Sequence, residues 1–482
     1  MDEAVKVEAE EEEEEEAKQV TPSGDGVGVS VTGLTPPPVV DDSGWHHMYV
    51  TVRLKPLDAE PHQGRTGRAS ERQISSWDPG AGGVTIGNHG AALRSFHYPV
   101  ATLPPSCTQD QAYRATLPRL VEAFLQGFNV NFLAFGQTGS GKTYTMFGPP
   151  GCMGEASARL RHGTAGVDTY PLPQHGMFLR AAFSIQDTIE ASEDFDRAAL
   201  TATMVELHWD QVVDLLNDKA PCSIGTDHTV RGATMVPLHS HEDVVHLAAA
   251  VEKRTTNATL MNDTSSRAHC ITSLTLTTRR DDRVTTRVFQ FFDLMGSERA
   301  KGQNSAHDTR VNAKETVSGF EGIVANMSLS QFALCVQRVI ENNKSRQRRA
   351  NKKMKRPGST GKQGTAWCPF RFMQFTRAVH KSFFGTALTC MVITLSQAPR
   401  NGNESYHSLM YGENVHKLKT RPKPVASKKF SGLIETCKAK VAEHSAALAR
   451  LEKTGTNKKF VTVRRNEVAR WSAILHRLEL VC

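Results

Sequence analysis

The chain has 482 residues, 39% of them hydrophobic and 22% charged, which suits one large globular domain with appendages. Its apolar runs are shorter than the roughly 18 to 20 residues of a membrane span, and no signal-peptide core opens the chain, which favours a soluble, non-secreted protein. The nine cysteines form no CxxC pair, so a disulfide framework and a zinc site lack support. The net charge of +8 is uneven, because residues 1–16 carry −9 and residues 17–482 carry +17.

This charge distribution predicts a basic body behind an acidic arm. The arm, residues 1–44, contains an unbroken glutamate run and a stretch rich in Ser, Gly and Pro; it cannot bury enough apolar surface to fold and should be disordered. Shielding of a basic surface and a solvated tail without function both remain open for it. The basic body needs an acidic partner, and composition does not choose among nucleic acid, anionic membrane and acidic protein.

The predicted elements alternate along the chain between strands and helices. An alternating segment over 48–56 predicts a strand, and residues 58–90, rich in Gly, Ser and Arg, are expected to form a loop. Apolar residues at helical spacing predict a helix over 112–128, and the apolar run 130–135 follows as a buried strand. Further strands are expected at 200–208, 271–278, 287–294 and 387–395. This alternation indicates an α/β architecture.

Directly after the buried strand comes GQTGSGKT, Gly136 to Thr143, which fits the pattern G-x-x-x-x-G-K-[ST]. In such a loop the glycines let backbone N–H groups curl around phosphates, the lysine reaches the β and γ oxygens, and the final hydroxyl binds Mg²⁺. The following helix points its N-terminus at the anion. The loop therefore predicts a nucleoside triphosphate site, against the alternative of a glycine-rich turn without function.

Two later segments carry polar groups that suit the same site. NDTSSRAH places the hydroxyls of Ser265 and Ser266 beside Arg267, and DLMGSE puts the carboxylate of Asp293 at the end of an apolar strand. A carboxylate there can hold the Mg²⁺ shell, and the N–H of Gly296 can contact a γ-phosphate. Taken singly, each segment could equally be a polar turn or a helix cap.

Taken together and in this order, the segments resemble the kinesin motor domain. GQTGSGKTYTM is the kinesin phosphate loop, NDTSSRAH is close to the switch I pattern NxxSSRSH, and DLMGSERA is close to the switch II pattern DLAGSERA. Outside the site, VRLKP resembles the first-strand segment near the adenine, NMSLS resembles the NKSLS start of the switch II helix, and PFRFMQFTR resembles PYRDSKLTR. The resemblance covers about residues 46–421. It implies a P-loop NTPase fold of kinesin type, with a central, mostly parallel sheet and helices on both faces.

The resemblance also implies the domain boundaries, the cofactors and the site residues. The motor would span 45–421 and a short helical appendix 422–482, and the cofactors would be ATP and Mg²⁺. The nucleotide would contact Arg53, Pro56, Gly136, Gln137, Thr138, Gly139, Ser140, Gly141, Lys142, Thr143 and Tyr144. The metal would be held by Thr143 and Ser266, with Asp293 acting through the metal's water shell. Four residues would sense the γ-phosphate or close the site through a salt bridge: Ser265, Gly296, Arg267 and Glu298.

A basic segment, Lys344 to Lys362, holds nine basic residues and no acid. A solvated loop or a nuclear-targeting patch is the general interpretation of such a run. The resemblance instead implies a loop that faces the microtubule and attracts the acidic tubulin tails. The expected microtubule-binding residues are Lys344, Arg346, Arg348, Arg349, Lys352, Lys353, Lys355, Arg356 and Arg371.

The C-terminal appendix begins with TRPKPVASKKF, which loosely resembles a neck linker. Apolar residues then recur at alternating spacings of three and four over 434–451, a heptad-like seam that could form a weak homodimer or pack on the motor as an amphipathic helix. A further short helix is expected over 466–481.

Several residues depart from the kinesin pattern. Ala268 replaces the serine of SSRSH, Met295 replaces the alanine of DLAGSERA, and Phe372 to Gln374 replace DSK. The resemblance as a whole implies a microtubule-stimulated ATPase that moves along microtubules in the cytoplasm. The alternatives are a non-motile, nucleotide-gated microtubule-binding protein with weak ATPase activity and, disfavoured by the resemblance, a nucleic-acid-dependent ATPase.

Overall fold

The computed structural model describes residues 46–57, 73–80, 82–88, 91–98, 100–152, 171–208, 211–247, 268–297, 327–345, 368–454 and 458–482. All of these belong to one compact unit, Leu34–Cys482. Several expectations fall outside the described residues: the acidic arm 1–44, the catalytic and metal candidates Ser265, Ser266, Arg267 and Glu298, and the basic residues Arg346, Arg348, Arg349, Lys352, Lys353, Lys355 and Arg356.

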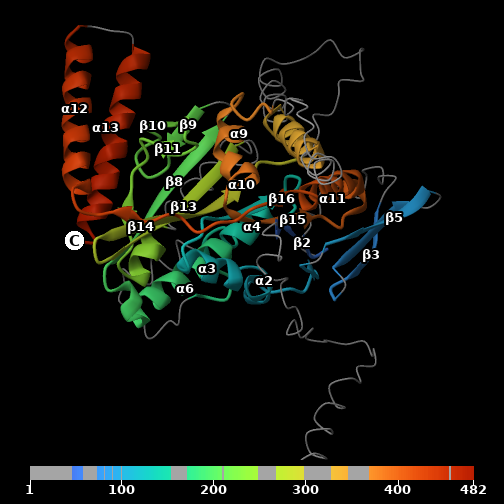
Figure 1. The fold of residues 1–482 in the computed structure, drawn as a ribbon. Coiled ribbons are helices and arrows are strands. Elements are labelled where there is room, and N and C mark those ends of the chain that lie inside the picture. The colour runs from blue at the N-terminus through green and yellow to red at the C-terminus, as the bar shows by residue number, and fades with distance from the viewer. Residues whose placement is uncertain are drawn as a thin grey trace, which may run out of the picture. The chain divides into compact units, whose positions relative to one another are not determined.

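A mixed central sheet runs in the spatial order β11-β10-β9-β8-β13-β14-β7-β15-β2-β6 (Figure 1). Neighbours from β14 to β6 are parallel, and those from β14 to β11 are antiparallel. Its strands are β2 (Tyr49–Leu54), β6 (Thr102–Leu103), β7 (Val130–Phe135), β8 (Ala198–His208), β9 (Gln211–Asp214), β10 (Pro221–Ile224), β11 (Val230–Arg231), β13 (Ala268–Arg280), β14 (Arg283–Asp293) and β15 (Leu388–Leu395). Two short strands join it from the side: β12 (Val236–Pro237) pairs with β8, and β17 (Lys428–Lys429) pairs with β14.

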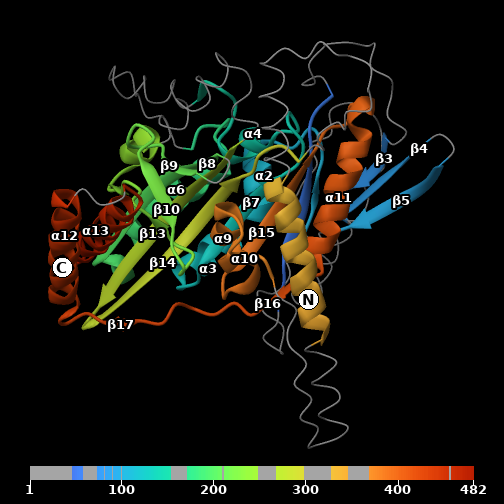
Figure 2. The same ribbon diagram turned by 90° about the horizontal axis from the view of Figure 1, so that it is seen from above.

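The parallel part of the sheet is the most deeply buried. Every residue of β2, β7 and β15 is buried, which agrees with strands covered on both faces and with the apolar runs in their sequences. Helices supply the cover (Figures 1 and 2). One face carries α2 (Gln109–Thr116), α3 (Pro118–Leu125) and α6 (Met177–Ala191); the other carries α9 (Gln374–Ala378), α10 (His380–Phe384), α11 (Gly402–His416) and the helical stretch 327–345. The expected α/β fold is confirmed.

Two expectations about elements were wrong. Part of the loop expected over 58–90 is a separate antiparallel sheet of β3 (Gln73–Asp78), β4 (Gly83–Asn88) and β5 (Ala91–His97). The helix expected over 112–128 is two helices, because Pro118 cannot continue a helical hydrogen-bond ladder and instead begins α3. A small pair of β1 (His46–His47) and β16 (Lys419–Thr420) joins the start and end of the expected motor region.

The C-terminal region folds back onto the sheet. Helices α12 (Leu433–Lys453) and α13 (Lys458–Glu479) form a hairpin beside the antiparallel part (Figure 1). The heptad-like seam belongs to α12, and its Cys437 is fully buried in a cluster with Phe430, Leu478 and Val481. Ile434 and Cys437, the first two residues of the seam, thus pack within the chain. No helix in the described ranges has the length and apolarity that crossing a membrane requires.

Candidate nucleotide site

The glycine-rich loop predicted to bind phosphates lies between the end of β7 and α4 (Lys142–Met146). Gly139 and Gly141 have φ of +78° and +102°, a left-handed conformation that other residues rarely adopt. A Cβ atom at either position would meet no heavy atom within 4 Å. The loop therefore presents its backbone to open space, as a phosphate cradle requires.

Gly136 has a different role in the same loop. A Cβ atom there would lie 2.3 Å from the carbonyl oxygen of Thr394 and 2.7 Å from Oγ of Ser140. The Ser140 hydroxyl in turn bonds to the Gln137 oxygen at 2.8 Å and lies 2.7 Å from the Thr394 hydroxyl. Gly136 and Ser140 thus fix the loop against β15, and the other glycines leave its outer side open.

Lys142 is 7% exposed, and its ammonium group donates to the carbonyl oxygens of Gly136 (2.9 Å) and Gln137 (2.7 Å). Carbonyl oxygens of the loop therefore hold the cation at the start of α4. A phosphate oxygen is a stronger acceptor than a neutral carbonyl, so the arrangement suits a lysine that turns to an incoming phosphate.

The hydroxyl of Thr143 donates to Oδ2 of Asp293 at 2.8 Å. Asp293 ends β14 and lies opposite Ala134 of the adjacent parallel strand β7, so the two strand ends bring the phosphate loop and the carboxylate together. A hydroxyl backed by a carboxylate is an oxygen donor set of the kind that Mg²⁺ prefers. The structure thus brings Thr143 and Asp293 together, and their role in holding a metal stays a prediction.

The segment after Asp293 runs alongside the phosphate loop. The amide of Ser297 donates to the carbonyl of Gly136 at 3.0 Å, and the amide of Leu294 donates to the carbonyl of Ala134 at 3.4 Å. Gly296 lies directly before Ser297, so its peptide belongs to a segment already joined to the loop.

Arg53 and Tyr144 lie together on the other side of α4. The buried guanidinium of Arg53 donates to Gln109 Oε1 (2.8 Å), Thr145 Oγ1 (3.2 Å) and the Cys107 carbonyl (3.3 Å), and burial lowers its pKa. It also lies 5.2 Å from the centre of the Tyr144 ring, which is 44% exposed. Arg53 thus holds α4 through contacts on its buried side, and the Tyr144 ring is partly exposed to solvent.

Lys55 is a site residue that the sequence reasoning missed. Its Nζ donates to the carbonyl of Gly139 at 2.9 Å, which brings a second cation to the phosphate loop, and Pro56 follows it half-buried. The sequence held a signal for this residue, because Lys55 lies in VRLKP two residues after Arg53. Residues two apart along a strand direction point to the same face, and Lys55 follows directly after the end of β2.

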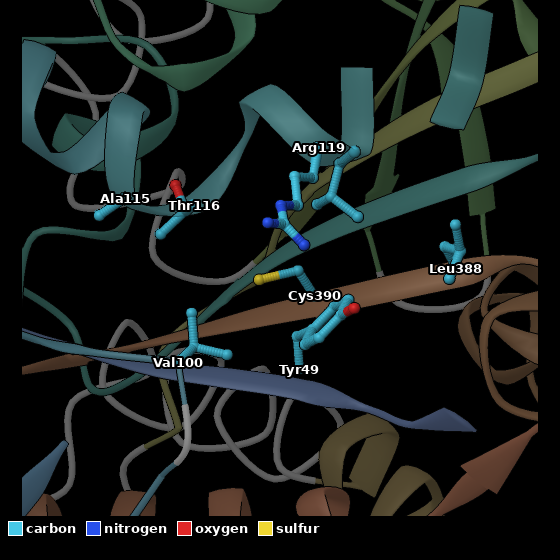
Figure 3. A pocket seen from close by; sticks show the side chains of 8 residues that line it. Tyr49, Val100, Ala115, Thr116, Arg119, Leu388 and Cys390 are labelled. Carbon is cyan, nitrogen blue, oxygen red and sulfur yellow. The ribbon is translucent and has the colours of Figure 1, made fainter. Parts of the chain in front are cut away.

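A cavity elsewhere in the molecule is separate from this loop. It is lined by apolar residues together with Tyr49, Thr116, Cys390 and Arg119, and the side chain of Arg119 points from α3 toward the sheet (Figure 3). Tyr49 begins β2 and Leu388 begins β15, so the cavity lies where the parallel strands start and the phosphate loop where they end. Within the described residues no group of three or more His, Cys, Asp or Glu side chains could hold a metal ion.

Of the expected microtubule-binding residues, the structure describes Lys344 and Arg371. Both are exposed, and they flank the part of the basic segment outside the described residues. Phe372, which replaces an aspartate of the kinesin pattern, is 60% exposed, whereas Met373 is buried.

The fold and the loop define a P-loop protein of the α/β class. The kinesin motor domain family pattern matches residues 56–418, most of the chain, and the chain belongs to that family. It is similar to the kinesin-like protein klp-19 of Caenorhabditis elegans (29% identity over 67% of this chain and 26% of that protein). It is also similar to the human chromosome-associated kinesin KIF4A (28% identity over 72% of this chain and 25% of that protein).

The chain spans about a quarter of the length of these two relatives. Among solved structures it matches one described as a fast kinesin, with a TM-score of 0.57 and 21% identity over 79% of this chain and 94% of that one. At this identity the match supports the fold.

Proposed function

We propose that the protein is an ATPase that microtubules stimulate, and that it couples hydrolysis to movement along microtubules in the cytoplasm. The observation that carries this proposal is the 2.8 Å bond between Thr143 and Asp293, which joins the phosphate loop to the segment containing Gly296. A chain of the kinesin family with this junction holds the parts needed to detect a γ-phosphate next to a metal site.

The phosphate loop binds the nucleotide through its own backbone and Lys142. The open left-handed positions at Gly139 and Gly141 let backbone N–H groups approach the phosphates, and Lys142 exchanges its carbonyl partners for phosphate oxygens. Tyr144 supplies an exposed ring for the base, held from behind by Arg53.

The catalytic part of the proposal rests on positioning. When bound, Mg²⁺ neutralises negative charge on the phosphates; Thr143 and Ser266 are the residues that would hold it directly, and Asp293 would act through its water shell. Ser265 and the Gly296 amide would bind the γ-phosphate, and a salt bridge between Arg267 and Glu298 would close the site and help to order the attacking water. Most of the rate enhancement in phosphoryl transfer comes from such placement of charge.

Steady-state ATPase assays with and without microtubules test this function. Thr143→Ala removes the hydroxyl and should lower kcat by about a hundredfold or more, whereas Thr143→Ser keeps it and should retain most activity. Gly296→Ala should retain nucleotide binding and lose microtubule stimulation. Equal activity in the two Thr143 variants would remove the metal-site argument, and stimulation by nucleic acid in place of microtubules would overturn the proposal.

A second candidate, a non-motile protein whose microtubule affinity depends on nucleotide, is favoured by the C-terminal contacts. The linker segment, residues 421–432, is bonded along the motor: Lys423 N–H to Thr386 O (3.0 Å), Val425 N–H to Gly127 O (2.8 Å), and β17 to β14. The hairpin beyond it is anchored to the sheet. A linker fixed at both ends limits how far the C-terminal part can swing.

A gliding assay separates the two candidates. The full chain is attached to a surface through its C-terminus, and microtubule movement and ATP-dependent release are both recorded. Movement supports the motor; nucleotide-dependent binding with no movement supports the second candidate.

A further inference from the structure

His269 occupies a buried position between three parts of the motor. It lies near the start of β13, two residues after Arg267, and is 3% exposed. Its ring contacts the switch II segment through the amide of Met295, the helical stretch 327–345 through Ser328, and α9 through Phe375.

The hydrogen bonds around the imidazole ring determine its tautomer. The Met295 N–H can only donate, so Nδ1 (3.3 Å away) must accept. The proton of a neutral ring then sits on Nε2, which donates to the Ser328 hydroxyl at 3.0 Å. The Ser328 hydroxyl donates in turn to Sδ of Met295 at 3.5 Å. The chain of contacts therefore closes on the residue where it began.

The ring is also held in place by stacking. Phe375 lies parallel to it, with ring centroids 3.9 Å apart and planes 2° apart, and Phe332 of the helical stretch packs edge-on against Phe375. Because the imidazole cannot tilt without losing this contact, a displacement of the Met295 amide must either break its bond to His269 or move Ser328 with it.

Two of the contacting residues depart from the kinesin pattern. Met295 stands where DLAGSERA has alanine, and Phe375 stands where PYRDSKLTR has leucine. Alanine has no acceptor for the Ser328 hydroxyl, and leucine has no aromatic face for the imidazole. His269 and Ser328 themselves match the pattern, so this chain adds two contacts to a histidine–serine pair that it shares with it.

We propose that His269 is a positioning residue that couples the Met295–Gly296 peptide to the helical stretch 327–345, and that Met295 and Phe375 strengthen this coupling. The inference rests on the proposed function, because it assumes that the Gly296 peptide responds to the γ-phosphate. Nucleotide state at the phosphate loop is then transmitted to the helix that precedes the basic segment.

Hydrogen exchange on the full chain tests the coupling without requiring turnover. Amide exchange over 327–345 is compared between Mg·ADP and a magnesium complex of a non-hydrolysable ATP analogue. In the wild type we expect a difference between the two. His269→Asn keeps an acceptor near Nδ1 but cannot reach Ser328, and Ser328→Ala removes the partner; both should abolish the difference, with nucleotide Kd changed by less than about fivefold.

The matched control is His175→Asn. His175 is fully buried and also accepts a backbone amide at Nδ1, from Leu172 at 3.2 Å, but it lies away from the switch II segment. It should lower thermal stability and leave the nucleotide-dependent difference intact. Retention of the difference in both His269→Asn and Ser328→Ala, or its absence in the wild type, would overturn the inference.

The two proposals fail in distinguishable ways. If the exchange difference depends on His269 but microtubules do not stimulate the ATPase, the coupling is supported and the proposed function is overturned. Stimulated ATPase with an exchange difference that survives both variants removes the coupling alone. Relative to the wild type, a kcat that Ser328→Ala lowers about fivefold at unchanged KM for ATP would agree with a positioning role.

Discussion

At the scale of single residues, the phosphate loop divides its glycines between two tasks. All three glycines have a positive φ (+155°, +78° and +102°), but only at Gly136 would a Cβ atom also collide with a neighbour, the Thr394 carbonyl oxygen of β15. The motif pattern alone does not separate these two cases. Substitution by alanine is therefore expected to cause a steric clash at Gly136 but not at Gly139 or Gly141.

Gly136→Ala should lower the stability of the protein. Its Cβ would lie 2.3 Å from a backbone oxygen of Thr394, and such overpacking typically costs about 1–3 kcal/mol, to which the positive φ of +155° adds backbone strain. The change is measured as a lower midpoint of thermal unfolding without nucleotide. Gly80→Ala is the control, because its Cβ would have 3.5 Å to the nearest atom. Equal midpoints for the two variants would contradict the close packing of Gly136 on β15.

The site was predictable where a local motif dictates it. Lys142 and Thr143 follow from the spacing of the phosphate loop, and Asp293 from an acid at the end of an apolar strand. The sequence pointed to the Lys55 region but not to the contact partners of Lys55 and His269, because these lie 84 and 26 residues away and depend on which strands become neighbours. The contact of Met295 with Ser328 could not be predicted either, because the sequence shows only that a bulky residue replaces alanine.

At the scale of elements, the C-terminal hairpin is anchored at two places. Near its ends, Leu478 and Val481 pack with Phe430 and Cys437. Along α13, Arg470 pairs with Asp227 at 2.9 Å, Glu467 pairs with Arg231, and Asn466 donates to Ser223 at 3.1 Å. The apolar cluster carries more of the stability, since partly exposed ion pairs contribute about 0–1 kcal/mol each.

Leu478→Asp should release the hairpin from the sheet. Leu478 is 3% exposed, and an unpaired carboxylate in the apolar cluster would be strongly unfavourable. We expect limited proteolysis within 421–432 to become at least about tenfold faster. Phe460→Asp, on the same helix at a position that is 61% exposed, should leave the rate unchanged. Equal cleavage rates in both variants would show that the cluster does not hold the linker segment.

The elements were predictable where apolar runs or helical periodicity are long. The strands at 130–135, 200–208 and 387–395 lie within or match the observed ones, because strands buried on both faces need continuous apolar residues. The sheet of β3 to β5 was missed, since its short strands carry Gly, Ser and Arg and expose Trp77. The start of α13 was missed because KKFVTVRR lacks an apolar stripe.

At the scale of the whole molecule, charge is distributed unevenly along the chain. The basic segment contributes nine positive charges to the +17 of residues 17–482. Lys344, the first residue of this segment, is exposed, and so is Arg371 beyond its end. Attraction of this kind acts at long range and is screened by salt.

Neutralising Lys352, Lys353, Lys355 and Arg356 to alanine should weaken microtubule binding about tenfold at low salt and much less at high salt. Cosedimentation over a salt series measures the effect. The control replaces Lys428, Lys429, Lys438 and Lys440, which removes the same charge from β17 and α12. Equal losses in both variants would mean that net charge, and not the basic segment, governs binding. Deletion of residues 1–30 in the same assay tests whether the acidic arm shields the segment.

The folded-back C-terminus also determines how the motor would transmit mechanical force. Arg279 of β13 donates to the carbonyl of Cys482 at 3.2 Å, and its guanidinium lies 3.9 Å from the ring centre of Phe430. Tension applied at Cys482 would therefore enter the sheet at the β13–β14 turn before it reached α11. This turn lies at the opposite end of β14 from Asp293, the residue that contacts the phosphate loop, so such a force would reach the sheet at the end away from that loop.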